Sequence, residues 1–448
     1  MKMKYFGTDG FRGEAGTVLT ADHAYQIGRF LGWYYNQEHK GRIVIGKDTR
    51  RSSYMFEYAL TAGIVASGSD AYLLHVTTTP SVAYVVRTEG FDCGVMISAS
   101  HNPFYDNGIK VMDSNGHKMS ATLEQQMEDY IDGNISELPF SIGDGIGITF
   151  DYAIGRNRYI GYLISLATRS YKGKRIGLDC ANGSTFNIAK NVFDALGAKT
   201  YAIGNEPNGL NINKECGSTH LEKLQALVLE KELDAGFAFD GDADRCLVVD
   251  ENGEIIDGDY IIYICGKYLK KHGRLDGNHV VTTIMANLGL FKALDHAKIE
   301  YDITNVGDKY VNEDMIAKGY TLGGEQSGHI IFSKHATTGD GILTAIMLME
   351  VMLEEKMSLH ELSSGITKFP QYLKNVKVSD KSLVMNNEKI LSLRDEISNK
   401  LGDEGRILLR ESGTEPVIRV MVEAQSDEIC EKYVDRMICA MKTEGLAD

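Results

Sequence analysis

The chain repeats one pattern of apolar and polar positions three times. Each copy opens with a basic residue and a run of β-branched residues that ends in small or polar side chains. These runs begin at Arg42, Arg175 and His279. A helical pattern, a second short strand, another helical pattern and a third strand follow each run, and the second strands begin near Ser69, Ala198 and Ile299. Apolar runs of this length predict buried parallel strands, so we expect three β-α-β-α-β units.

The three most polar motifs of the chain follow the third strand of each unit. They are SASHNP at 98–103, DGDADR at 240–245 and GGEQSGH at 323–329. Because the three units share one order of elements, the three motifs occupy one topological position. Ligands of open α/β sheets bind at the carboxyl ends of the strands. The pattern therefore predicts that the three motifs converge on one cleft.

After Pro370 the pattern changes to a shorter unit. Helical periodicity at 388–401 and 427–442 accompanies strands predicted at 405–410 and 416–424, which is typical of a small α+β domain. The fold class that we predict is α/β, with three similar mixed α/β domains and a smaller C-terminal α+β domain. The expected domains are 1–153, 154–254, 255–369 and 370–448.

Charge and cysteine content narrow the classes of function. The 448 residues include 47 Lys and Arg against 62 Asp and Glu, a formal charge of −15. That charge argues against nucleic acid or an anionic membrane as a general partner, so any anion site has to be locally basic. The seven cysteines are scattered singly with no CxxC pair, and the first residues lack an apolar signal region. Both features favour reduced thiols and a cytoplasmic protein.

Residues 97–110, ISASHNPFYDNGIK, place an apolar strand directly before a hydroxyl and an imidazole. Ser100 falls where the buried strand reaches the surface, His101 follows it, and Asn102-Pro103 turns the chain. A packed core does not require this combination. We therefore expect Ser100 to be a covalent phosphoryl carrier and the other motifs to hold a phosphorylated substrate against it.

Three carboxylates alternate in the DGDADR motif. In an extended conformation Asp240, Asp242 and Asp244 project to one side and repel one another unless a cation lies between them. All-oxygen ligands indicate Mg²⁺ or Mn²⁺, and a phosphate on Ser100 would complete such a site. A solvated acidic turn or a calcium loop is the alternative, although the glycine and distal Glu of an EF-hand are missing. Arg245 is either a phosphate ligand or the salt-bridge partner of the carboxylates.

The remaining polar motifs offer ligands for a sugar and for a phosphate. Glu325 and Ser327 lie two residues apart between glycines, which suits a pair of sugar hydroxyls. His329 beside them is either a group that titrates near neutrality or an ordinary polar surface residue. The turn RESGTEP begins at Arg410, and Arg419 follows on the next strand, so this turn can hold a phosphate. A simple surface hairpin would explain its turn residues but not its arginines.

Five motifs in order give the chain a resemblance to the α-D-phosphohexomutase family. They are GTDGFRG, ISASHNP, DGDADR, GGEQSGH and RESGTEP. The resemblance implies four domains in a heart shape around a central cleft, three of them with one α/β topology. Stretches from Gly307 and Thr337 look like the branch of the family that interconverts glucosamine 6-phosphate and glucosamine 1-phosphate. That branch works through a sugar 1,6-bisphosphate intermediate and supplies UDP-N-acetylglucosamine for peptidoglycan.

The resemblance also implies roles for individual residues. It makes Ser100 the active-site phosphoserine and assigns one Mg²⁺ per chain to Ser100, Asp240, Asp242 and Asp244. Residues expected near the reacting phosphoryl group are Arg12, His101, Lys110 and Arg245. Residues expected to bind the sugar are Gly307, Asp308, Glu325, Ser327 and His329. Residues expected at the distal phosphate are Arg410, Ser412, Gly413, Thr414 and Arg419.

Two of these expectations carry conditions. Lys110 is the first candidate for the general base if neighbouring cations lower its pKa, and His101 is the second. The chain also departs from the family pattern twice, because Glu411 replaces the usual Pro and Ala243 replaces a common Gly. Neither departure removes a predicted ligand, but both affect the expected geometry of their loops.

The resemblance implies a small amino-sugar phosphate as the partner and neither nucleic acid nor membrane. It also implies a homodimer through the first domain.

Other functions would use some of the same motifs. A phosphoglucomutase or phosphomannomutase would differ in the sugar that it accepts. A haloacid-type phosphatase is disfavoured because DGDAD lacks the Thr or Val of the DxDx[TV] motif. A noncatalytic sugar-phosphate binding protein would keep the binding motifs without phosphorylation of Ser100.

Overall fold

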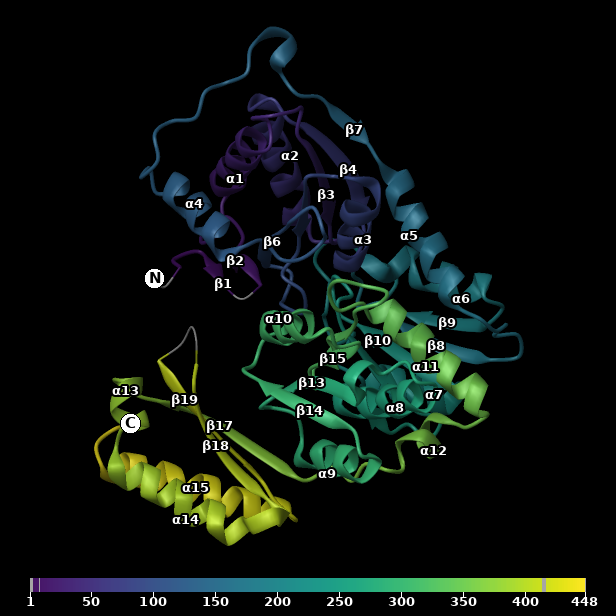
Figure 1. Cartoon of the computed structure of the whole chain (residues 1–448), viewed down its shortest axis with the longest axis vertical. Helices are drawn as coiled ribbons and strands as arrows, with labels where there is room; N and C mark the ends of the chain where they lie inside the picture. The colour runs from purple at the N-terminus through teal and green to yellow at the C-terminus, as the bar shows by residue number, and fades with distance from the viewer. Residues whose placement is uncertain (1–2, 8, 413–415, 448) are drawn as a thin grey trace. The chain divides into compact units, whose positions relative to one another are not determined.

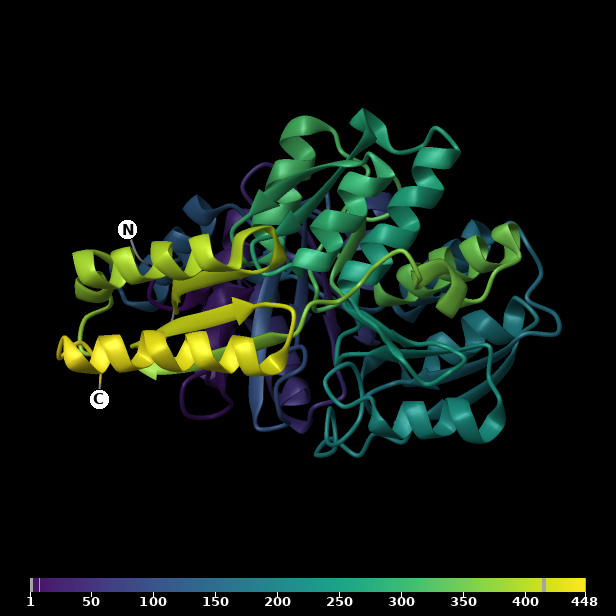
Figure 2. The same ribbon diagram turned by 90° about the horizontal axis from the view of Figure 1, so that it is seen from below.

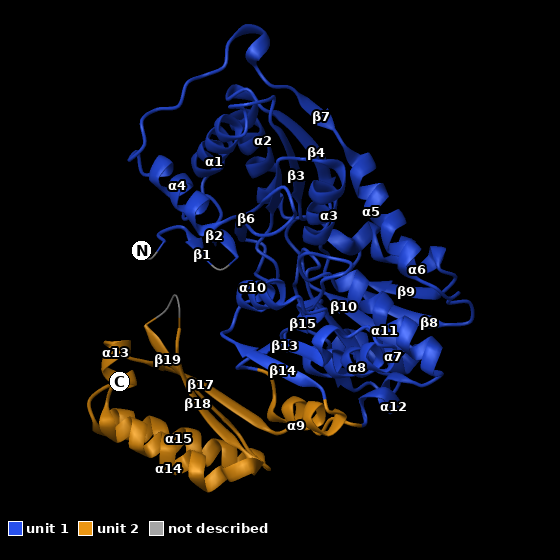
Figure 3. Ribbon diagram, in the orientation of Figure 1, with its two compact units in different colours: residues 1–285, 299–364 blue, residues 286–298, 365–448 orange. Residues whose placement is uncertain are grey.

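The computed structural model describes residues 3–7, 9–412 and 416–447. The chain divides into two compact units, coloured blue and orange in Figure 3. Unit 1 comprises residues 1–285 and 299–364, and unit 2 comprises residues 286–298 and 365–448. None of the helices in the described ranges combines the length and the apolar character that crossing a bilayer requires.

The first sheet of unit 1 has seven strands in the order β1-β2-β6-β5-β3-β4-β7. They are β1 (Phe6–Gly7), β2 (Gly10–Glu14), β3 (Arg42–Lys47), β4 (Asp70–Val76), β5 (Cys93–Ile97), β6 (Asp106–Met112) and β7 (Thr149–Asp151). The helices of this part are α1 (Ala21–Tyr34), α2 (Arg51–Ala66), α3 (Thr79–Glu89) and α4 (Ala121–Ile131). Strand β3 is parallel to β4 and β5, and β6 pairs antiparallel with β5. Figure 1 shows β3 and β4 side by side.

The second sheet has the order β12-β11-β10-β8-β9. Its strands are β8 (Arg175–Asp179), β9 (Lys199–Ile203), β10 (Ala235–Phe239), β11 (Cys246–Val249) and β12 (Ile255–Ile256). Helices α5 (Ala153–Leu166), α6 (Ala189–Ala195) and α7 (Glu222–Lys231) accompany it. Strand β8 is parallel to β9 and β10, and β11 pairs antiparallel with β10.

The third sheet has the order β14-β13-β15-β16. Its strands are β13 (His279–Thr283), β14 (Glu300–Thr304), β15 (Leu322–Gly324) and β16 (Ile330–Phe332). Helices of the same part are α8 (Gly258–Lys271), α10 (Asp308–Lys318), α11 (Gly341–Glu355) and α12 (Leu359–Ser363). Strand β13 is parallel to β14 and β15, and β16 pairs antiparallel with β15.

The three sheets share one core topology, which confirms the repeat predicted from the sequence. In each sheet the first strand lies between the second and the third and is parallel to both. A fourth strand runs antiparallel beside the third. The fourth strand was not predicted. It makes each polar motif the loop of a hairpin between a buried parallel strand and its antiparallel neighbour. The motif loops are 98–105, 240–245 and 325–329.

Local capping explains where two helices near these loops begin. The Thr78 hydroxyl accepts a hydrogen bond from the backbone of Ser81 at the start of α3, which also carries Pro80 in its first turn. Asp340 caps α11 by accepting from the backbone of Leu343 at 2.9 Å. The same Asp340 accepts from the Tyr159 hydroxyl at 2.8 Å, which joins α5 to α11.

Unit 2 is a three-stranded antiparallel sheet with the order β17-β19-β18. Its elements are β17 (Gln371–Lys377), α13 (Lys381–Met385), α14 (Glu388–Leu401), β18 (Arg406–Glu411), β19 (Val417–Glu423), α15 (Asp427–Thr443) and, from earlier in the chain, α9 (Leu288–Ala297). Figure 2 shows α14 and α15 on one face of the sheet. The buried Glu423 carboxylate accepts from the backbone of Leu288 at 3.0 Å and from Arg406 at 2.6 Å, and so holds α9 in this unit.

Candidate active site

The structure brings the three motif loops of unit 1 together. The loop at 98–105 touches the loop at 240–245 so closely that a Cβ on Gly241 would lie 2.5 Å from the Ser100 carbonyl oxygen. The loop at 325–329 joins them through the Cys246 amide, which donates to the Gly328 carbonyl at 3.0 Å. The predicted convergence of the three motifs is therefore confirmed.

Ser100 is the residue on which the first loop turns. Its backbone has a φ of +53°, a left-handed conformation that is uncommon for a residue with a side chain. Only 1% of the residue is exposed. Its hydroxyl donates a hydrogen bond of 2.5 Å to Asp240 Oδ2 and lies 3.3 Å from His101 Nδ1. The hydroxyl therefore faces the acidic motif rather than bulk solvent.

The three carboxylates of the second loop form one buried cluster. Ligand atoms of Asp240, Asp242 and Asp244 lie within 4.8 Å of one another. Burial and the charges of Asp244 and Asp242 hold the pKa of Asp240 well above its ordinary value. One carboxylate oxygen of Asp242 and one of Asp244 are buried without a hydrogen-bond partner. Clustered acids with orphaned oxygens fit a divalent cation with oxygen ligands, because the cation would remove both the repulsion and the unmet bonds.

Ala243 explains how alternate residues of this loop reach one point. It is fully buried and has a φ of +58°, so the chain reverses its direction between Asp242 and Asp244. Glycine adopts this conformation without steric cost, whereas alanine is strained in it. Alanine in place of glycine at position 243 therefore keeps the shape of the loop but adds backbone strain.

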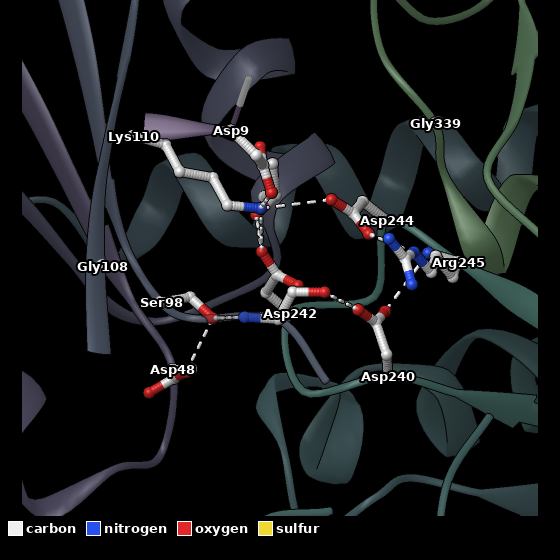
Figure 4. A network of polar contacts seen from close by, with 12 residues as sticks. Asp9, Asp48, Ser98, Gly108, Lys110, Asp240, Asp242, Asp244, Arg245 and Gly339 are labelled. Carbon is white, nitrogen blue, oxygen red and sulfur yellow. Dashed lines mark hydrogen bonds and ion pairs between the residues drawn. The ribbon is translucent and has the colours of Figure 1, made fainter. Parts of the chain in front are cut away.

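The side chain of Lys110 on β6 points into the acidic cluster, as Figure 4 shows. Its Nζ lies 2.7 Å from Asp242 Oδ2, 3.2 Å from Asp244 Oδ2 and 3.1 Å from Asp9 Oδ2. Burial by itself lowers the pKa of Lys110, but these three carboxylates outweigh burial and hold the pKa well above its ordinary value. The prediction that neighbouring cations lower the pKa of Lys110 and make it a general base is therefore wrong. Its nearest charged neighbours are carboxylates, which raise that pKa.

A chain of ion pairs extends from Lys110 to the third repeat. Asp9 binds Lys110, forms an ion pair with Arg12, and lies 3.2 Å from Lys118 Nζ. Lys118 in turn lies 2.6 Å from Asp308 at the start of α10. Neither Asp9 nor Lys118 was among the site residues predicted from the sequence. Asp9 stands inside the GTDGFRG motif and could have been found there, whereas nothing in the sequence marks Lys118.

His101 and Arg245 meet beside the Ser100 hydroxyl. Arg245 Nη1 donates to His101 Nδ1 at 3.2 Å. Burial and the charges of Arg245 and Arg12 lower the pKa of His101 to about 4. Arg245 Nε lies 4.0 Å from Asp244, and its backbone amide donates to Asp240. Arg245 thus contacts both the imidazole and the acidic cluster, and its role as a phosphate ligand stays a prediction.

The third loop orients its carboxylate through the backbone. Glu325 Oε1 accepts from the Gly307 amide at 3.0 Å, and the Ser327 hydroxyl is buried without a hydrogen-bond partner. His329 Nε2 accepts from the backbone of Gly339 at 3.0 Å, which leaves Nδ1 facing Asp244 at 3.8 Å. His329 is therefore a buried neighbour of the acidic cluster rather than a surface residue.

The predicted phosphate-binding residues of unit 2 are described only in part. Arg410 and Arg419 are direct cross-strand partners in β18 and β19, a position in which like charges repel each other. Ser412 is buried, and its carbonyl accepts from Lys381 Nζ at 2.6 Å. Gly413 and Thr414 lie outside the described residues.

The chain matches four protein-family models, all of phosphoglucomutase/phosphomannomutase. Alpha/beta/alpha domain I matches residues 3–137, domain II residues 157–253, domain III residues 257–369 and the C-terminal domain residues 373–439. The chain belongs to this family. The Ser100 loop, the acidic loop and the Glu325 loop fall one each in domains I, II and III of the phosphoglucomutase/phosphomannomutase family. The exact residues at which we divided the four domains stay a prediction.

Individual relatives agree with the family models. The chain is 62% identical over 442 residues to a phosphoglucosamine mutase of Lachnoclostridium phytofermentans, with 99% of each chain covered. It is 48% identical to a phosphoglucosamine mutase of Bacillus mycoides, covering 98% of this chain and 99% of the relative.

Solved structures show the same fold. A phosphoglucomutase/phosphomannomutase family protein of Burkholderia thailandensis has a TM-score of 0.81 at 23% identity, covering 99% of this chain and 98% of that one. An N-acetylphosphoglucosamine mutase of Aspergillus fumigatus, solved with GlcNAc-6P and magnesium, has a TM-score of 0.70 at 19% identity, with 99% and 96% covered. At these identities the likeness establishes the phosphohexomutase fold and nothing about the substrate of this chain.

A cavity of about 360 Å³ borders the site in this family member. Lys110, Lys118, Asp244 and Asp308 contribute to its wall, together with apolar residues of β6 and polar residues of α10, whereas Ser100 does not line it. The ion-paired side chains that hold the acidic cluster therefore also form one side of a cavity of ligand size.

Proposed function

We propose that this protein interconverts glucosamine 6-phosphate and glucosamine 1-phosphate. Phospho-Ser100 gives its phosphoryl group to the free hydroxyl of the sugar phosphate, so the P–O bond to Ser100 breaks as the bond to the sugar forms. The resulting 1,6-bisphosphate reorients, and its other phosphoryl group returns to Ser100. Relatives named phosphoglucosamine mutase, 62% identical over nearly the whole chain, support this choice of sugar.

One observation carries the proposal: a buried serine hydroxyl on a left-handed turn is in direct contact with a buried acidic cluster. A structural serine does not require three carboxylates within 4.8 Å of one another beside it. Phosphoryl transfer requires alignment of the reacting oxygens and neutralisation of charge, and this arrangement provides both around Ser100.

Asp240, Asp242, Asp244 and an oxygen of the Ser100 phosphate would hold one Mg²⁺ in this proposal. The all-oxygen donor set and the orphaned oxygens of Asp242 and Asp244 support it. When bound, Mg²⁺ supplies charge neutralisation for the transferring phosphoryl group.

The basic side chains around Ser100 are assigned to charge stabilisation and to proton transfer. We assign Lys110, Arg12 and Arg245 to stabilising the negative charge of the phosphoryl group. Each is a buried or half-buried cation that contacts Ser100's neighbour His101 or interacts with the acidic cluster. We assign proton transfer to His101, whose Nδ1 lies 3.3 Å from the Ser100 hydroxyl.

Substrate recognition is assigned to loops other than the serine loop. Glu325 and Ser327 would bind sugar hydroxyls. The hydrogen bond from the Gly307 amide orients the Glu325 carboxylate, which supports this role. Residues of the same sugar site are Asp308 and His329. Residues assigned to the distal phosphate are Arg410, Ser412, Gly413, Thr414 and Arg419.

The test measures isomerisation of the three 6-phosphates of glucosamine, glucose and mannose. We expect kcat/KM to be highest for glucosamine 6-phosphate and intact-mass mapping to find one phosphate on Ser100. A higher kcat/KM for glucose or mannose phosphate would instead identify a phosphoglucomutase or phosphomannomutase. Release of inorganic phosphate without isomerisation would indicate a phosphatase, and binding without phosphate on Ser100 would indicate a noncatalytic protein.

We also propose a homodimer in the cytoplasm. The outermost strand β7 and its flanks expose Ile142, Ile146, Ile148 and Phe150, an apolar row that supports an interface with a second copy. Sedimentation equilibrium would show the mass of two chains, and replacing Ile148 with Lys should return the mass of one.

A further inference from the structure

We propose that Arg50 and Asn213 are positioning residues that fix the backbone of Ser100 for phosphoryl transfer. The inference rests on the proposed function, because it gives a purpose to contacts with the residue that would carry the phosphoryl group. Both side chains bind the carbonyl oxygens of Ser100 and Asn102, although they come from different α/β repeats.

Arg50 holds the serine loop from the first repeat. It is fully buried, and its Nη2 donates to the carbonyls of Ser100 and Asn102, both at 2.9 Å. Its Nη1 donates to the Asp106 carbonyl at 3.1 Å, so one guanidinium spans the loop. Asp48 neutralises the charge, because its Oδ2 accepts from Arg50 Nε at 2.8 Å.

Asn213 holds the same two carbonyls from the second repeat. Its Nδ2 lies 2.9 Å from the Ser100 oxygen and 3.0 Å from the Asn102 oxygen. The residue is buried, has a φ of +58°, and is anchored by its own amide, which donates to the Ala181 carbonyl at 2.8 Å. The serine loop is therefore fixed to the repeat that carries the acidic cluster, and not only to its own.

The peptide on the other side of Ser100 is fixed as well. The Ser100 amide donates to Ser98 Oγ at 3.0 Å, and Ser98 Oγ donates to Asp48 Oδ2 at 2.7 Å, as Figure 4 shows for Ser98 and Asp48. Asp48 thus connects Arg50 with Ser98. Hydrogen bonds hold the backbone of Ser100 both before and after its Cα.

These contacts offset the strain at Ser100. A left-handed φ is unfavourable for serine, and the residue keeps it only where its surroundings determine it. In an extended conformation the Ser100 side chain would leave Asp240. A reacting group has to be held within about 0.5 Å of its productive position, and a displacement of about 1 Å can cost on the order of 100-fold in rate. Weakening the contacts should therefore lower kcat, whereas KM should change little because the sugar is assigned to other loops.

The experiment compares Asn213→Gly with Glu215→Gly. Both residues lie in one loop with φ near the left-handed value, +58° and +51°, so glycine relieves the same strain at each. Asn213→Gly removes both hydrogen bonds to the serine loop, whereas Glu215→Gly removes an exposed side chain that pairs with Lys223. Relative to Glu215→Gly, we expect Asn213→Gly to lower kcat about 10- to 100-fold. We expect KM to change less than about threefold.

A second readout follows the chemical step directly. Phosphate incorporation at Ser100 from glucose 1,6-bisphosphate, timed by intact mass, should slow by the same factor as kcat in Asn213→Gly. Arg50→Lys keeps the charge beside Asp48 but cannot span two carbonyls, so it should slow incorporation in the same way. Thermal midpoints measured in parallel show whether each variant is folded.

Two results would overturn the inference. One is an Asn213→Gly variant whose kcat and incorporation rate match those of Glu215→Gly. The other is a change of kcat and KM together that follows only the loss of stability. If the wild-type protein itself takes no phosphate on Ser100, the proposed function fails and the positioning role falls with it. If the wild type is phosphorylated normally and the two glycine variants behave alike, only the positioning role fails.

Discussion

The Ser100 hydroxyl donates a 2.5 Å hydrogen bond to Asp240, a residue 140 positions later in the chain. The predicted phosphoryl carrier and the predicted metal ligands therefore share one buried surface. This contact makes Ser100 the first residue to test.

Ser100→Ala should lower the mutase activity more than about 1000-fold, because it removes the hydroxyl that we propose as the phosphoryl carrier. The fold should persist, because a single hydroxyl is lost. The assay follows glucosamine 6-phosphate isomerisation with glucose 1,6-bisphosphate as activator. Ser114→Ala, at an exposed position, is the matched control and should retain full activity. Ser100→Ala activity within tenfold of wild type would refute the carrier role.

Asp240→Asn should raise the stability of the metal-free protein and abolish its response to Mg²⁺. The substitution keeps the shape of the side chain and removes a carboxyl whose ionisation burial and its neighbours oppose, as its raised pKa shows. At alkaline pH in EDTA, where wild-type Asp240 has to ionise, the variant should gain on the order of 1 kcal/mol. Mg²⁺ should stabilise the wild type by binding the folded state, but not this variant. Thermal unfolding with EDTA and with Mg²⁺ measures both effects.

Asp234→Asn is the control for that experiment, because Asp234 pairs with Lys174 away from the cluster. It should leave the Mg²⁺ response unchanged. An Asp240→Asn variant that Mg²⁺ stabilises as much as wild type would exclude the acidic cluster as the metal site.

Ala243→Gly should stabilise the protein. A left-handed alanine costs about 1–2 kcal/mol, whereas glycine loses about 0.5–1 kcal/mol of extra chain entropy on folding, so the net gain is about 0.5–1 kcal/mol. Ala238→Gly in the neighbouring strand β10 is the control and should destabilise the protein, because its backbone is extended and buried. The thermal midpoints of both variants check the prediction. A lower midpoint for Ala243→Gly than for wild type would contradict it.

Glu124→Gln should gain stability over wild type as the pH rises. Burial raises the pKa of Glu124 from 4.5 to about 7. Between these values the unfolded chain has released the proton that the folded chain still binds, so rising pH removes stability from the wild type. Glutamine does not ionise, so we expect a relative gain on the order of 1–2 kcal/mol, allowing for partial screening by solvent.

Thermal midpoints at about pH 5 and about pH 8 measure that gain. Glu137→Gln, at an exposed position, should show the wild-type pH dependence. A constant difference between Glu124→Gln and wild type at both pH values would mean that Glu124 is already ionised at about pH 5.

Much of the fold could be predicted because it depends on local pattern. The strands predicted from Arg42, Arg175 and His279 are β3, β8 and β13, and the helix predicted at 388–401 is α14. Apolar runs and helical periodicity show which faces are buried, and burial largely decides the type of element. The antiparallel fourth strand of each sheet was missed, and two of these strands, β11 and β16, have only four and three residues.

The sequence by itself determined the repeat, the order of the motifs, and the chemistry that Ser100 and the three alternate aspartates offer. Only the tertiary structure decided which charges meet. The carboxylates that raise the pKa of Lys110 include one 132 residues away, and the amide of Asn213 reaches the Ser100 carbonyl across 113 residues. Periodicity records whether a position is buried but not which distant residue packs against it. Ion pairs, pKa shifts and backbone clamps depend on that packing, and so they become visible only in the folded chain.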